Sequence, residues 1–99
     1  MSKETPAYLI GHITVKDDEK WGEYCGKVPG TLVPWGAELV FRGKRRALMS
    51  GAHPHPDTVV IRFPNAAALD GWFHSSAYQA LIALRNQAAE VVLIGYDAA

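Results

Sequence analysis

The sequence predicts a single α+β domain with a four-stranded antiparallel sheet and helices on one of its faces. Its 99 residues are enough for one domain, which we expect to span residues 1–99. Four short segments have the apolar or alternating pattern of strands. Between the first two of these segments, and again between the last two, apolar residues recur at helical spacing. This order of segments indicates the α+β class.

The first predicted elements are a strand and a helix. Residues 7–15 form the strand, and four side chains share one of its faces: Tyr8, Ile10, His12 and Thr14. Asp17 and Asp18 can cap the helix that follows. The apolar side of this helix contains Trp21, Tyr24, Cys25, Val28 and Leu32. Pro29 predicts a bend or break in the helix, and Gly36 predicts its end.

The second strand is predicted over residues 37–41, and we expect residues 45–50 to continue it after an irregularity at Gly43. Alternation divides its side chains between two faces, with Leu39 and Phe41 on one and Glu38, Val40 and Arg42 on the other. The segment 51–57 is rich in turn residues and is predicted as a turn.

The rest of the chain contains a strand, a pair of helices and a last strand. Residues 58–63 form the third strand, and Asn65 caps the first helix of the pair. Ser75 starts the second helix, one side of which carries Tyr78, Leu81, Ile82 and Arg85. Residues 90–96 form the fourth strand.

This order of elements, βαββαβ, is that of the ferredoxin-like fold. Its helices cover one face of the sheet, so the open face would expose an apolar patch of Tyr8, Ile10, Val40 and Val60. A second copy packed sheet against sheet would cover this patch, and two such sheets can enclose a cleft of small-molecule size. We therefore expect a homodimer.

Composition limits the partners and the compartment. Ten Lys and Arg residues balance ten Asp and Glu residues, which argues against nucleic acid or an anionic membrane as a partner. The single cysteine, Cys25, cannot form an internal disulfide and suits a reducing compartment. The sequence shows neither a signal peptide nor an apolar run of about 20 residues. These features predict a cytoplasmic protein.

Residues 7–96 resemble the family called domain of unknown function 1330, of the dimeric α/β-barrel superfamily. The most specific matching pieces are the YxxxVP run at 24–29, the FRG turn at 41–43, the FP strand end at 63–64 and the SxxYQ helix start at 75–79, with Arg85 after it. The resemblance implies a dimeric α/β barrel with a cleft. Members of the superfamily include cofactor-free monooxygenases, lactone isomerases, haem enzymes and binding proteins, so the resemblance implies no single reaction. Where the family usually shows an acidic residue, this chain reads KRRALMSG.

Two side-chain types suggest chemistry on the open face. His12 is the candidate general base there, because the ordinary pKa of histidine is close to neutral. The alternative is an interface histidine that a backbone carbonyl satisfies. Arg42 and Arg62 are predicted on the same face, where they can hold a substrate carboxylate or pair with a carboxylate of the protein, Glu38 or Glu90.

Other candidates come from the helices and the turn. Tyr24 is a candidate catalytic residue, because a buried hydroxyl needs a partner. Tyr78 and Arg85 can flank the mouth of a cleft. Alternatively, Arg85 lies near a helix end and can stabilise its own helix by interacting with the negative end of the helix dipole. The pair His53 and His55 supplies too few ligands for zinc, so we expect no metal site. The sequence has no nucleotide-binding motif, and we expect no cofactor.

Two functions remain open. In the first, the protein is a cofactor-free enzyme, monooxygenase- or isomerase-like, that acts on a small organic anion, with His12 as base and Arg42 or Arg62 holding the anion. In the second, the same cleft serves a non-catalytic binding or regulatory homodimer. Convergence of His12, Tyr24 and an arginine on one cavity would favour catalysis.

Overall fold

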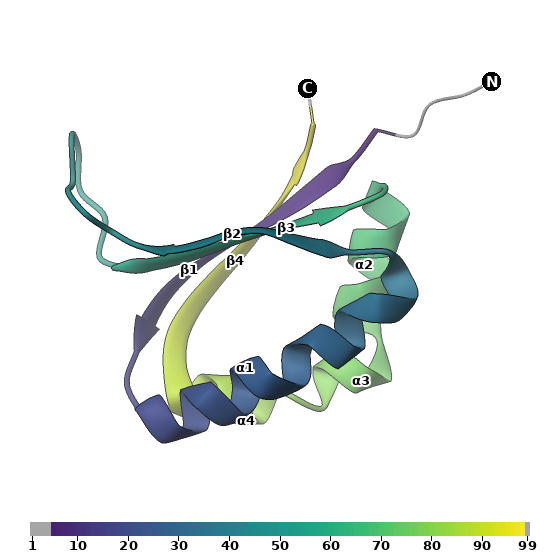
Figure 1. Ribbon diagram of the computed structural model, residues 1–99, viewed down its shortest axis with the longest axis horizontal. Coiled ribbons are helices and arrows are strands. Elements are labelled where there is room, and N and C mark those ends of the chain that lie inside the picture. Colours follow the sequence, from purple (N-terminus) through teal and green to yellow (C-terminus); the bar gives the residue numbers. More distant parts are fainter. Residues whose placement is uncertain (1–4, 99) are drawn as a thin grey trace.

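Four strands form one antiparallel sheet in the computed structural model, which describes residues 5–98. The elements in chain order are β1 (Ala7–Val15), α1 (Asp18–Leu32), the 3-10 helix η1 (Val33–Trp35), β2 (Glu38–Lys44), β3 (Asp57–Phe63), α2 (Ala66–His74), α3 (Ser76–Gln79), α4 (Ile82–Ala88) and β4 (Ala89–Asp97). The strands lie in the order β2-β3-β1-β4. All helices lie on one side of the sheet (Figure 1), so the predicted ferredoxin-like fold is confirmed.

The predicted helix starts are also confirmed, and side chains cap them. Asp17 Oδ1 accepts a hydrogen bond from the Lys20 N–H at 3.0 Å at the start of α1. Asn65 Oδ1 accepts one from the Ala68 N–H at 2.8 Å at the start of α2. Such caps satisfy backbone donors that have no partner inside the helix.

Two elements in the first half of the chain differ from the prediction. The predicted break near Pro29 does not occur: α1 runs through Pro29 to Leu32, because Tyr24 and Leu32 are buried on either side of the exposed proline and their packing holds the helix together. Strand β2 ends at Lys44, so residues 45–50 do not continue it. The facing segment contains two prolines, which cannot donate to a ladder.

A bulge in β2 changes which side chains face the helices. Leu39 pairs with Ile61, but Phe41 pairs with Val60, so Val40 is an extra residue in the ladder. The alternation of β2 therefore reverses after Val40. Phe41, whose ring lies against Gly43, is on the open face of the sheet.

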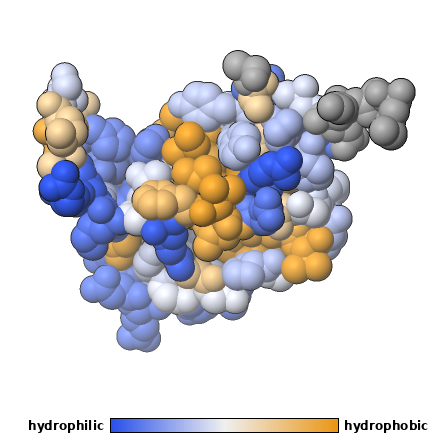
Figure 2. All heavy atoms as spheres, turned by 45° about the horizontal axis from the view of Figure 1, so that its top comes forward, coloured by the Kyte–Doolittle hydropathy of each residue, from blue (hydrophilic) through white to orange (hydrophobic). Residues whose placement is uncertain are grey.

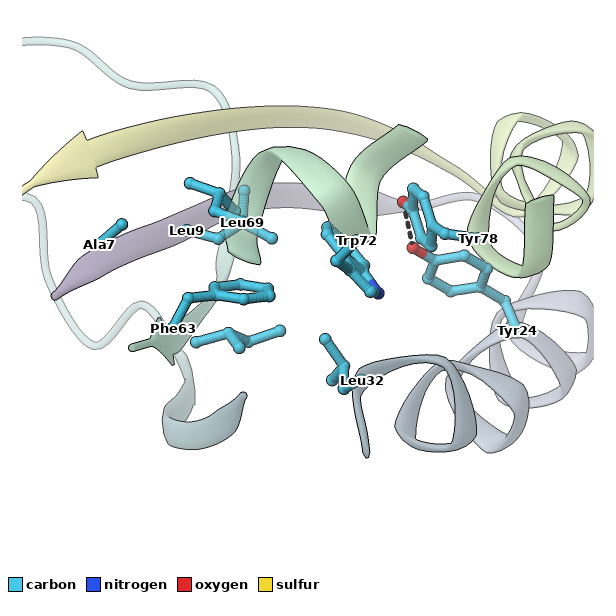
Figure 3. Close-up of a cluster of buried hydrophobic side chains, with 9 residues drawn as sticks. Ala7, Leu9, Tyr24, Leu32, Phe63, Leu69, Trp72 and Tyr78 are labelled. Carbon is cyan, nitrogen blue, oxygen red and sulfur yellow. Dashed lines mark hydrogen bonds between the residues drawn. The ribbon is translucent and has the colours of Figure 1, made fainter. Parts of the chain in front are cut away.

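Aromatic side chains form much of the core between the sheet and the helices (Figure 3). Trp72, Tyr78 and Phe63 are the largest fully buried side chains. The ring of Trp72 lies 4.1 Å from that of Tyr78 and 5.6 Å from that of Phe63, between centroids. The Trp72 indole N–H also donates to Thr31 Oγ1 at 2.9 Å, which fixes the orientation of the ring. Tyr78 is thus held firmly in the helix layer.

The open face of the sheet is apolar at its centre. Tyr8, Ile10 and His12 of β1 pair with Tyr96, Ile94 and Val92 of β4, and all six lie on this face. Figure 2 shows hydrophobic side chains gathered there between hydrophilic borders. Within residues 5–98, four of the exposed large apolar side chains lie on this face: Phe41, Val92, Ile94 and Tyr96. Among residues 5–98, no helix is long and apolar enough to cross a membrane.

Candidate functional site

A cavity of about 330 Å³ lies between α1 and the helix-facing side of the sheet. Most of its walls are apolar, with Leu9, Ile61 and Leu93 from the sheet and Trp21, Val28 and Leu32 from α1 among them. The predicted apolar side of α1 is therefore the side that faces the cavity. A cavity of this size and character suits a small organic molecule.

Two tyrosines bring hydroxyl groups to this cavity from different helices. Tyr24 of α1 and Tyr78 of α3 are both buried, and their hydroxyl oxygens lie 2.8 Å apart (Figure 3). Arg85 of α4 donates from Nη1 to the Tyr78 oxygen at 3.0 Å. The Arg85 guanidinium also contacts Asn86 Oδ1. Arg85, Tyr78 and Tyr24 thus form a hydrogen-bonded chain, called here the tyrosine chain.

The tyrosine chain has one more proton than it uses. Two hydroxyl groups hold two protons, but the bond between Tyr24 and Tyr78 uses only one of them. Arg85 has no acceptor atom, so it cannot take the second proton. Whichever tyrosine donates to the other, the second O–H has no acceptor among residues 5–98 and lies beside a cavity that both tyrosines line.

Tyr24 is suited to donate a hydrogen bond in its neutral form. Burial raises the pKa of Tyr24 far above its ordinary range, Tyr78 raises it further, and Arg85 opposes the rise. Tyr24 therefore keeps its proton at neutral pH. The positive charge of Arg85 polarises the Tyr78 hydroxyl, which strengthens its donation.

Arg42 and Cys25 lie at the mouth of the cavity. An adjoining hollow of about 500 Å³ shares Ile13, Trp21, Cys25 and Arg42 with the inner cavity and adds Lys44 and Asp57. Arg42 donates from Nη2 to Cys25 Sγ at 3.0 Å. Burial raises the pKa of the Cys25 thiol, and Arg42 opposes this rise. Cys25 is therefore a neutral acceptor.

The predicted position of Arg42 on the open face is wrong. Arg42 follows the bulge and pairs with Val59, whose side chain lines the cavity. The extra residue in β2 turned Arg42 from the open face to the helix side. The sequence carries no signal for the bulge, because Leu39, Val40 and Phe41 are all apolar.

Arg62 and His12 lie on the open face, as predicted. Arg62 pairs with Glu38 at 3.7 Å, with Arg62 partly exposed and Glu38 largely exposed, which agrees with the structural alternative for this arginine. The ring of His12 meets that of His53 at 4.7 Å between centroids, and Nδ1 of His12 is buried without a hydrogen-bond partner among residues 5–98. The sheet lies between His12 and the tyrosine chain, so the convergence of His12 with Tyr24 that would favour catalysis does not occur.

The sequence did not reveal the neighbours of His12. His53 also contacts His55, and His55 Nδ1 lies 2.8 Å from Thr14 Oγ1. These contacts depend on how the β2–β3 hairpin folds back on β1, for which local spacing gives no signal. Among residues 5–98, no group of three or more His, Cys, Asp or Glu side chains could hold a metal ion.

Comparisons with known proteins agree with this fold. Residues 6–97 match the model of a family described as Domain of unknown function (DUF1330). A protein of unknown function from Rhodopseudomonas palustris is 15% identical, with a TM-score of 0.82 over 97% of this chain and 84% of its own. A dimeric ferredoxin-like protein of unknown function from Jannaschia sp. CCS1 is 13% identical, with a TM-score of 0.75 over 94% of this chain and 99% of its own.

A third solved structure with this fold has a described activity. SnoaB, a cofactor-independent oxygenase from Streptomyces nogalater, is 8% identical, with a TM-score of 0.67 over 96% of this chain and 94% of its own. At this identity the likeness concerns the fold alone. None of the curated proteins matches the chain.

Proposed function

Because the chain belongs to the DUF1330 family, whose description names no reaction, we propose its function from its own cavity: it binds a small organic molecule whose carbonyl or anionic oxygen accepts a hydrogen bond from the tyrosine chain. One observation carries this proposal. An O–H that neither Tyr24 nor Tyr78 uses lies beside a largely apolar cavity, and a buried donor without an acceptor is unfavourable.

The charges at this end of the cavity favour an oxygen that bears negative charge. Arg85 has no carboxylate within salt-bridge distance among residues 5–98, so its charge is not neutralised by the protein there. The apolar walls favour rings or alkyl groups for the rest of the molecule. A phenolate or an enolate with a cyclic skeleton meets both conditions.

Binding without chemistry is the function that this arrangement supports best. None of the residues lining the cavity, all within residues 5–98, is a His, Asp or Glu, so the base expected from His12 does not face a bound molecule. The alternative is a cofactor-free enzyme, monooxygenase- or isomerase-like. It is supported by the donor chain, because the same O–H would stabilise an enolate or phenolate as it forms.

We also propose that a second copy of the chain covers the open face. The exposed apolar side chains there support this, because a patch of this kind is uncommon on a monomer (Figure 2). The description of the Jannaschia protein also calls that protein dimeric. In such a dimer each cavity lies on the far side of its sheet from the interface, so each copy holds a complete site.

Binding of 4-nitrophenol tests the proposal, since its phenolate is coloured and its phenol is not. We expect the bound compound to ionise at a lower pH in the wild type than in the double variant Tyr24→Phe/Tyr78→Phe, because the O–H stabilises the phenolate and either single variant would still leave one free O–H. Tyr96→Phe, on the open face, is the matched control and should behave as the wild type. Absence of binding, or equal ionisation in all three proteins, would overturn the proposal.

A further inference from the structure

Arg42 is a cation at the mouth of the cavity, and in the part of the chain that the structure describes it has no charged partner. Among residues 5–98 it is the one Lys or Arg side chain that lines the inner cavity. No carboxylate lies within 4.0 Å of its guanidinium in that part of the chain, whereas the neighbouring Lys44 pairs with Asp57 at 3.6 Å. The charge of Lys44 is thus largely offset, and that of Arg42 is not.

The contact with Cys25 leaves most of the Arg42 guanidinium available. A neutral thiol is a weak acceptor, and the contact involves Nη2 alone. A guanidinium has five N–H donors in a planar fork that matches the two oxygens of a carboxylate. The thiol therefore orients the guanidinium at the mouth without neutralising it.

We propose that the ligand is a cyclic carboxylic acid with an oxygen substituent at its other end. Its carboxylate binds Arg42 at the mouth, and its second oxygen accepts from the tyrosine chain inside. This inference rests on the proposed function, because it adds a second anchor to the same site. Asp57 at the mouth favours the single charge of a carboxylate over the higher charge of a phosphate.

Matched carboxylate and amide ligands separate the two anchors. Isothermal titration would compare 4-hydroxybenzoate with 4-hydroxybenzamide, and 4-hydroxycinnamate with its amide, since the two pairs differ in length. We expect the carboxylate of the pair with the better-fitting length to bind the wild type about tenfold more tightly than its amide. This is the gain typical of a charge-assisted hydrogen bond near a surface. In Arg42→Gln this preference should fall below about twofold.

Arg46→Gln is the control, because Arg46 is exposed on the hairpin and the substitution changes the charge equally. It should retain the tenfold preference. The inference is overturned if the wild type binds the amides as tightly as the carboxylates, or if Arg42→Gln keeps the preference. Amide binding that depends on Tyr24 and Tyr78 would then leave the proposed function intact. Failure of every ligand, 4-nitrophenol included, would overturn both.

Discussion

Tyr24 and Tyr78 show how residues 54 positions apart in the chain form one donor group. Each was recognisable in the sequence as an aromatic residue on a helix face. Their contact, and the third member Arg85, follow only from the packing of α1 against α3 and α4. Because a buried hydroxyl without a partner is costly, the chain has a structural role as well as its proposed role in binding.

His12 makes the stability of the protein depend on pH. Burial lowers its pKa from the ordinary 6.5, and nearby His53 and His55 lower it further. Below pH 6.5 the histidine is therefore protonated more readily in the unfolded chain than in the folded one. The contribution of neutral His12 to stability is fully present above pH 6.5 and is lost as the pH falls through the lowered pKa of the folded state. We expect urea denaturation to show a smaller loss between pH 7 and pH 5 in His12→Phe.

The matched control for this experiment is His74→Gln, since His74 is exposed at the end of α2. It should lose stability on acidification as the wild type does. Equal losses in the wild type and His12→Phe would show that His12 does not contribute to the pH dependence.

The elements differ in how far the sequence predicts them. The alternation of side chains predicted β1 with the same first and last residues as the structure has. Capping residues predicted the starts of α1 and α2. The bulge in β2 was not predictable, because three successive apolar residues fit either phase of alternation. That one residue placed Arg42 on the wrong face and so separated it from Tyr24 in the prediction, although both line the same cavity.

Helix α1 contains an interior proline that its packing tolerates at a cost. Pro29 has no N–H for the carbonyl of Cys25, and its ring crowds the preceding turn. We expect Pro29→Ala to raise the free energy of unfolding by about 2 kcal/mol, which is the helix penalty less the entropy that a proline removes from the unfolded chain. Urea denaturation at fixed protein concentration measures this change.

Pro34 is the natural comparison, since it occupies the first turn of η1, where a proline loses no hydrogen bond. Pro34→Ala should leave stability unchanged or lower it by less than about 1 kcal/mol. A Pro29→Ala variant that is no more stable than the wild type would mean that α1 has adapted fully to its proline.

At the scale of the whole molecule, the sheet has a ligand cavity on one side and an apolar surface on the other. We expect the wild type to be a dimer by light scattering after gel filtration. Ile94→Lys should shift it towards the monomer, because the substitution places a charge in the centre of the open face. Ala83→Lys, at an exposed position of α4, should remain dimeric.

A wild-type monomer at tens of micromolar would contradict the proposed interface. It would leave the cavity unaffected, because the tyrosine chain and Arg42 come from one chain. The two proposals are thus open to separate tests.

In most of the sheet, odd-numbered residues serve ligand binding and even-numbered residues serve assembly. In β1, β3 and β4, odd residues such as Leu9, Ile61 and Leu93 line the cavity, and even residues lie on the open face. Substitutions at odd positions can therefore change ligand preference during divergence while assembly is conserved, and the converse holds at even positions. Only β2 reverses its parity, after Val40. Loss of that single residue would alter ligand binding and assembly together, so β2 is the strand in which the two properties cannot evolve independently.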